Sequence, residues 1–155
     1  MNQDFAHNFK HTLSKFSTGV TVVTTKYKNH HYGVTVNSFT SLSLEPPLIL
    51  FNLGDKSHSL DAFTESGSFN VNILSKGQVD IAKNFAKAAD DKFSGITFTE
   101  DEKENAIFAD NIALLNCDFH SSHHIGDHYL IVGSVTNMQC REDLDPLIYF
   151  NSNFA

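Results

Sequence analysis

The sequence predicts a mainly β protein, an antiparallel barrel or sandwich with only short helices. About six or seven apolar or β-branched segments are separated by turn residues, which is the spacing typical of an antiparallel sheet. Helical periodicity is confined to short stretches. No glycine-rich turn joins a strand to a helix, so the sequence does not support a Rossmann dinucleotide site, and any cofactor must bind on the surface of the sheet.

Three segments are expected to be helical. Apolar residues recur at helical spacing near the start of the chain and predict an amphipathic helix over 4–16. Ser57 is a candidate N-cap for a short helix that ends at Gly67, and a further short helix is expected over 78–87. The apolar residues of the first helix are Phe5, Phe9, Leu13 and Phe16.

The expected strands are short apolar segments bounded by turn signals. Val20 opens a run that is β-branched throughout, and residues 28–31 read as a hairpin turn ahead of the next strand. The acidic stretch 90–110 is expected to be a mostly exposed excursion, and 120–128 a histidine-rich loop between two strands. The predicted strands cover residues 20–25, 32–37, 48–53, 69–74, 112–119, 129–140 and 146–150.

Composition and charge limit the class of protein. With 155 residues, 41% of them apolar, the chain is long enough for one folded domain, 1–155, and too short for two. A net charge of −7 argues against nucleic acid as a partner, because Lys and Arg do not cluster. No apolar run approaches the roughly 18 residues of a membrane span, and no signal peptide is evident, so we expect a cytoplasmic protein with no membrane partner. Cys117 and Cys140 fit no CxxC pattern and are expected to be buried, unpaired thiols.

The most informative segment is the run 33–48, which a double proline ends. Small hydroxyl and amide side chains alternate there with apolar ones, which places the two kinds on opposite sides of an extended backbone. Such a ledge can hold a flat polar heterocycle, but it is also what any half-exposed antiparallel strand shows. The polar side carries Thr35, Asn37, Thr40 or Ser41, and Ser43; the apolar side carries Val36, Phe39 and Leu42.

Two other clusters are candidate ligand sites. Residues 120–128 contain four histidines, but adjacent histidines on an extended chain point apart and no Cys or Glu joins them, so the spacing does not favour a metal site. His128 follows Gly126-Asp127 at the start of a strand and is either an exposed loop histidine or a group that contacts a carboxamide or a phosphate. Lys56-Ser57 is either a phosphate site at a helix N-terminus or a plain N-cap. The other three histidines are His120, His123 and His124.

In combination, these segments resemble the short-chain flavin reductases of two-component monooxygenases, the family similar to the reductase component of 4-hydroxyphenylacetate monooxygenase. Two motifs carry most of the resemblance: the string Thr-Val-Asn-Ser-Phe-x-Ser-x-Ser-Leu-x-Pro-Pro-Leu over 35–48, and the triplet Gly126-Asp127-His128. Matching segments follow in order through nearly the whole chain, including 16–24, 66–74 and 145–147.

The resemblance implies a split β-barrel of the FMN-binding type and a homodimer with the flavin near the subunit interface. It also implies that NADH or NADPH reduces FMN or FAD, and that the reduced flavin supplies a separate oxygenase. The resemblance also implies a role for individual residues. The isoalloxazine ring would be contacted by Thr35, Val36, Asn37 and Ser38, and its edge and the ribityl chain by Ser41, Leu42 and Ser43. The flavin phosphate would be bound by Lys56 and Ser57, the pocket would be closed by Phe85 and Ala86, and the nicotinamide nucleotide would face His128.

No acid–base pair stands out in the sequence, which fits a reaction in which hydride passes between two stacked rings and the protein supplies orientation. Two other functions remain open at this level. One is a flavin-binding electron carrier that retains FMN, and the other is a metal- or haem-handling protein that uses the histidine-rich loop.

Overall fold

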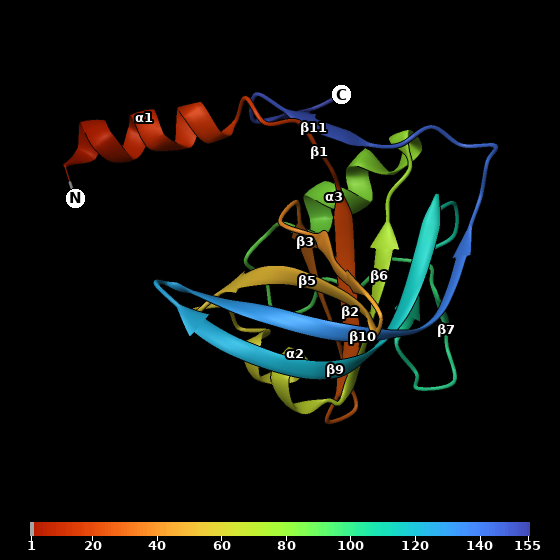
Figure 1. Ribbon diagram of the computed structural model, residues 1–155. Helices are drawn as coiled ribbons and strands as arrows, with labels where there is room; N and C mark the ends of the chain where they lie inside the picture. The colour runs from red at the N-terminus through yellow and green to blue at the C-terminus, as the bar shows by residue number, and fades with distance from the viewer. Residues whose placement is uncertain (1) are drawn as a thin grey trace.

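The computed structural model describes residues 2–155 and has a curled antiparallel sheet at its centre (Figure 1). Its seven strands are hydrogen-bonded in the order β3-β2-β6-β9-β10-β5-β4, and every neighbouring pair is antiparallel. The predicted mainly β, antiparallel fold is therefore confirmed. The strands are β2 (Thr21–Tyr27), β3 (His30–Val36), β4 (Thr40–Leu44), β5 (Pro47–Gly54), β6 (Ser68–Ile73), β9 (Ala113–Ile125) and β10 (His128–Cys140).

Smaller elements flank this sheet. A three-stranded sheet joins β1 (Thr18–Gly19), β11 (Ile148–Phe150) and β12 (Asn153–Phe154), and β7 (Thr99–Glu100) pairs with β8 (Ala106–Ile107). The helices are α1 (Gln3–Leu13), α2 (Leu60–Glu65) and α3 (Val79–Phe85), the last preceded by the 3-10 turn η1 (Lys76–Gln78). Within residues 2–155, no helix has the length and apolar character needed to cross a membrane.

Strand β2 is buried on both faces and separates two apolar cores. Its residues alternate between them: Val23 belongs to a first core inside the curl of the sheet, and Val22 to a second core under α3. Phe63 of α2 packs in the first core, where three phenylalanine rings meet edge to face. The β-branched run that predicted this strand thus reflects burial on both sides, not exposure of one side.

The acidic excursion is less exposed than predicted. Ala106 and Phe108 are buried in it, because buried amides hold this segment against the sheet. The Asn72 side chain accepts a hydrogen bond from the Phe108 backbone N–H (3.2 Å) and one from the Asn111 amide (2.8 Å). Thr24 Oγ1 donates to the Ala106 carbonyl at 2.6 Å. The alternation of apolar residues and the charge of this segment did not predict its burial, because the groups that anchor it are polar side chains on strands distant in sequence.

The predicted first helix exists, but it ends at Leu13 and buries none of its residues. In Figure 1, α1 projects from the body of the molecule. Phe5 and Phe9 are 62% and 52% exposed. The predicted helical periodicity is confirmed, and the apolar side of the helix is exposed in the described chain.

The histidine-rich loop is not a loop. Strands β9 and β10 continue through it and join in a two-residue turn at Gly126 and Asp127, where Gly126 has a φ of +64°. A glycine suits this left-handed backbone conformation because it has no Cβ. The extra histidines are therefore strand residues of β9.

The run 33–48 is also not one continuous ledge. It bends at residues 37–39 and divides between β3 and β4, which form the two edges of the seven-stranded sheet. At the bend, Ser38 is attached to β5: its Oγ accepts from the Asn52 N–H at 2.9 Å and donates to the Asn52 carbonyl at 3.3 Å. The predicted apolar side also fails at Leu42, which is 51% exposed and lies at a register shift of β4.

Candidate functional site

A small pocket lies at the end of β3, where four residues predicted to hold the flavin come together. Thr35, Val36 and Asn37 form one wall, and Ala86, just after α3, lies on the other. The pocket has a volume of about 170 Å³. Three further lining residues were not predicted: Val20, Tyr149 and Phe154.

The unpredicted residues come from the beginning and end of the chain. Tyr149 and Phe154 pair with each other across β11 and β12, and their rings lie 5.3 Å apart. The small three-stranded sheet carries them to the pocket, since β1 continues towards Val20 and pairs with β11. The only sequence signal was aromatic residues near a chain end, and that signal does not specify which surface they cover.

Packing between β3 and α3 sets the distance between the two walls. Thr35 Oγ1 donates to the Ala82 carbonyl at 2.6 Å, so this hydroxyl is used to attach the strand to the helix. Phe85 does not line the pocket. It is fully buried in the second core, directly behind the wall, where its ring packs against Gly33.

The chemistry of the lining fits a flat heteroaromatic ring such as isoalloxazine. Aliphatic and aromatic side chains from Val20, Ala86 and Phe154 offer surfaces on which a ring can pack. The exposed amide of Asn37 offers hydrogen-bond donors and an acceptor at the rim. Small-molecule sites typically combine such an apolar lining with a few polar groups that fix orientation.

The remaining residues predicted for the ring edge lie on β4, the free edge of the sheet. Ser41 and Leu42 are exposed, and Ser43 is half-buried. None of the three lines the 170 Å³ pocket. Ser38 is half-buried and links the bend to β5 through its two bonds to Asn52.

The predicted phosphate and nicotinamide residues lie together at the far end of β5. His128 opens β10 and pairs in register with Gly54, the last residue of β5, just before the turn that carries Lys56. The Asp55 N–H donates to the Asp127 carbonyl at 3.0 Å, which fastens this turn to the tip of the hairpin. Pairing of β5 with β10 thus places a lysine beside a histidine that is distant in sequence.

An aspartate orients the His128 ring. His128 Nδ1 lies 2.7 Å from Asp127 Oδ1, which leaves Nε2 free. The hydrogen bond from His128 lowers the pKa of the Asp127 carboxyl, and the nearby charges of His128 and Lys56 act in the same direction. Ser57 is not the helix N-cap: α2 begins at Leu60 after Ser59, and Ser57 Oγ accepts from the Ser59 N–H at 3.3 Å.

The other histidines have local partners. His124 stacks on Tyr129 with 4.7 Å between ring centroids, and its Nε2 lies 3.8 Å from Asp55 Oδ2. His120 and His123 each lie 3.2 Å from a serine hydroxyl. In residues 2–155, no three His, Cys, Asp or Glu side chains gather closely enough to hold a metal ion.

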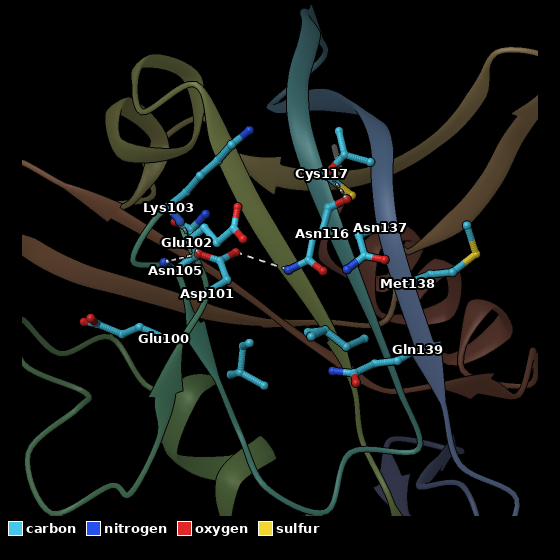
Figure 2. Close-up of a pocket in the computed structure, with 13 residues that line it drawn as sticks. Glu100, Asp101, Glu102, Lys103, Asn105, Asn116, Cys117, Asn137, Met138 and Gln139 are labelled. Atoms are coloured by element: carbon cyan, nitrogen blue, oxygen red, sulfur yellow. Dashed lines mark hydrogen bonds between the residues drawn. The ribbon is translucent and has the colours of Figure 1, made fainter.

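Two hollows of more than 400 Å³ lie elsewhere. Figure 2 shows one of about 430 Å³, between the excursion at Glu100–Asn105 and strands β9 and β10, crossed by the hydrogen bond between Asp101 and Asn116. The other, of about 650 Å³, lies between the start of β3 and the segment after α3. No residue predicted to bind flavin or nicotinamide lines either hollow.

An open antiparallel sheet with a small pocket at one strand end, lined by both apolar and polar groups, defines the class as a mainly β protein with a candidate small-molecule site. Comparison with known proteins identifies the family within this class. The model of the flavin reductase like domain family matches residues 13–155. The chain belongs to this family and is a flavin reductase.

Individual relatives agree. The chain is 35% identical to a flavin reductase of Pseudomonas putida over 148 residues, which cover 95% of this chain and 87% of the relative. It is 33% identical to the reductase component of 4-hydroxyphenylacetate 3-monooxygenase of Thermus thermophilus, over 94% of this chain and 93% of the relative. A solved NADH:FAD oxidoreductase of Streptomyces globisporus, in complex with NAD and FAD fragments, superposes with a TM-score of 0.93 at 29% identity, covering 100% of this chain and 94% of that one.

Proposed function

We propose that the protein reduces FMN or FAD with NADH or NADPH, with the isoalloxazine ring held in the pocket between Thr35–Asn37 and Ala86. The observation that carries this proposal is the meeting of these two predicted segments, from β3 and from the end of α3, around one half-apolar pocket. When bound, the flavin accepts a hydride from the nicotinamide, so the protein needs to bind and orient both rings and not to supply an acid or a base.

The two predicted parts of the site lie within reach of one ligand. Asn37 is followed by Ser38, which is hydrogen-bonded to Asn52. Asn52 is two residues, or about 7 Å of extended strand, from Gly54, which faces His128 across the sheet. A nucleotide whose ring lies at Asn37 therefore extends towards Lys56 and His128, where a cation suits its phosphate.

The substitution Ala86→Leu tests the placement of the ring. Ala86 lines the pocket, and three added heavy atoms would occupy much of its 170 Å³. The matched control is Ala88→Leu, an exposed position two residues further along that does not line this pocket. We expect Ala86→Leu to weaken flavin binding by about 100-fold, measured by quenching of flavin fluorescence, and Ala88→Leu to leave it unchanged. Equal flavin affinity in both variants would disprove the placement.

A homodimer, also part of the proposal, is supported by apolar surfaces that a single copy leaves uncovered. The 11-residue helix α1 is too short to be stable alone in water, yet its Phe5, Phe9 and Leu13 are exposed. The free edge strand β4 exposes Leu44 to 92%. A second copy that packs on these surfaces would stabilise α1 and cover an edge that otherwise invites aggregation.

Phe9→Ser tests this assembly, with His7→Ser as the control on the opposite side of the same helix. We expect light scattering after size-exclusion chromatography to give twice the 17.3 kDa of one chain for the wild type and His7→Ser. Phe9→Ser is expected to shift the population towards 17.3 kDa. A wild type that elutes as a monomer would contradict the assembly.

Relatives named as reductase components of monooxygenases support the proposal that the reduced flavin leaves to supply a separate oxygenase. The cytoplasmic location stays a prediction from the sequence. Turnover distinguishes this role from that of an electron carrier which retains FMN. A reductase oxidises NADH at a rate that saturates with added free flavin. A carrier purifies with bound flavin and does not respond to added flavin.

A further inference from the structure

Lys92 is a half-buried lysine without an acidic partner. It lies in the segment after α3, and its Nζ donates two hydrogen bonds, both to backbone carbonyls: to Phe85 at 3.0 Å and to Gly33 at 3.1 Å. No Asp or Glu carboxylate in residues 2–155 lies within ion-pair distance of it. Burial lowers the pKa of the Lys92 ammonium. The two carbonyl bonds replace part of the hydration that the ammonium group loses on burial.

The two carbonyls that Lys92 binds belong to the two walls of the pocket. Gly33 lies on β3, two residues before Thr35, and Phe85 is the last residue of α3, immediately before Ala86. Lys92 is itself held in place, because its own carbonyl accepts a hydrogen bond from the Asn84 amide at 2.6 Å. One side chain therefore bridges the strand and the helix end at the level of the pocket.

Other contacts between the walls act differently. The bond from Thr35 to Ala82 joins β3 to the helix one turn earlier, and the Phe85 ring packs on Gly33 without directional bonds. Lys92 alone among these groups contacts both the strand backbone and the carbonyl next to Ala86. Loss of its ammonium group would free the helix end to shift relative to β3.

We propose that Lys92 is a positioning residue that sets the width of the flavin pocket by tying the end of α3 to β3. The inference rests on the proposed placement of the isoalloxazine ring in this pocket. Lys92 acts through the backbone of Phe85 and Gly33, so its removal is expected to affect flavin more than the nicotinamide, whose proposed contact is His128 on another pair of strands.

The test compares Lys92→Met, which keeps most of the length of the side chain and removes the donors, with Lys92→Arg, which retains a cation and several donors. We expect Lys92→Met to raise the dissociation constant for FMN and for FAD about tenfold, with the KM for NADH changed by less than about twofold. The melting temperature is expected to stay within about 3 °C of the wild type, since an unfavourable buried charge is lost along with its bonds. Lys92→Arg is expected to recover most of the flavin affinity.

Lys83→Met is the matched control, because Lys83 is exposed on α3 and its side chain makes no hydrogen bond or ion pair within the described chain. Unchanged flavin affinity in Lys92→Met would overturn the inference. So would flavin affinity and melting temperature falling together without recovery in Lys92→Arg, since that pattern indicates a purely structural role. If the proposed placement of the ring is wrong, Ala86→Leu will leave flavin binding unchanged, and this result does not depend on the Lys92 variants.

Discussion

The substitution Gly33→Ala should weaken flavin binding indirectly, by moving the core behind the pocket and not by contact between the new methyl group and the ligand. A methyl group on Gly33 would lie 2.6 and 2.7 Å from two ring carbons of Phe85 and 3.4 Å from the Phe93 ring. Ordinary contact begins at 3.4 Å, so the Phe85 ring must retreat by about 0.8 Å. The ring is fully buried, and such overpacking typically costs about 1–3 kcal/mol. Because Ala86 follows Phe85 directly, the retreat moves one wall of the pocket.

The control is Gly133→Ala, which overpacks the first core. A methyl there would lie 2.5 Å from the Phe69 ring and 3.1 Å from Cys117 Cβ, away from the pocket lining. Both variants are expected to melt about 3–10 °C below the wild type. Only Gly33→Ala is expected to raise the dissociation constant for flavin, by about tenfold, since displacements near 1 Å in a binding site are costly.

Gly77→Ala completes the comparison, because the nearest atom to its added methyl, Ser75 Oγ, is 3.9 Å away. This variant should match the wild type in thermal melting and in flavin titration. If Gly33→Ala and Gly133→Ala lower flavin affinity equally, the loss reflects general destabilisation, and the link from Gly33 through Phe85 to the pocket is wrong.

Three further predictions concern other parts of the molecule. His128→Ala is expected to raise the KM for NADH about tenfold with flavin affinity unchanged, and unaltered steady-state kinetics would remove His128 from the nicotinamide site. Asn72→Leu is expected to destabilise the fold by about 2–4 kcal/mol in urea unfolding, because it leaves the partners of a buried amide unsatisfied. Burial raises the pKa of the Cys117 thiol to about 12, so this thiol stays protonated at pH 9. Cys140 is exposed, so the prediction that both cysteines are buried is wrong for this one. A thiol reagent should therefore modify only Cys140 in the native protein and both cysteines after denaturation.

The strands could be predicted because the residue types of each strand reflect how far that strand is buried. In β2 every position from Thr21 to Thr25 is buried, and the β-branched run there left no other assignment. The hairpin of β9 and β10 was truncated at its tip because histidine and serine carry no strong strand preference. Its extension depends on cross-strand pairing, which continues along the sheet to His128 and Ile125.

The lining of the pocket proposed for the flavin could be predicted only where a local motif includes its residues. The string over 35–48 located Thr35, Val36 and Asn37, but not the bend that separates them from β4. Tyr149, Phe154 and Lys92 were missed because each reaches the pocket through contacts with residues far away in sequence. The unpaired lysine also gave no signal, since its partners are backbone carbonyls, which every residue has.

The pocket lies where two separately packed cores meet, which explains how its shape can change without loss of the fold. Val36 belongs to the first core, and Val20 and Phe85 to the second. Few contacts join the two walls directly, so breaking one of them leaves the packing of each core intact. Substitutions at this boundary should therefore alter flavin affinity more than the free energy of unfolding. Substitutions deep in either core should do the reverse, so Lys92→Met should mainly lower flavin affinity and Gly133→Ala should mainly lower stability.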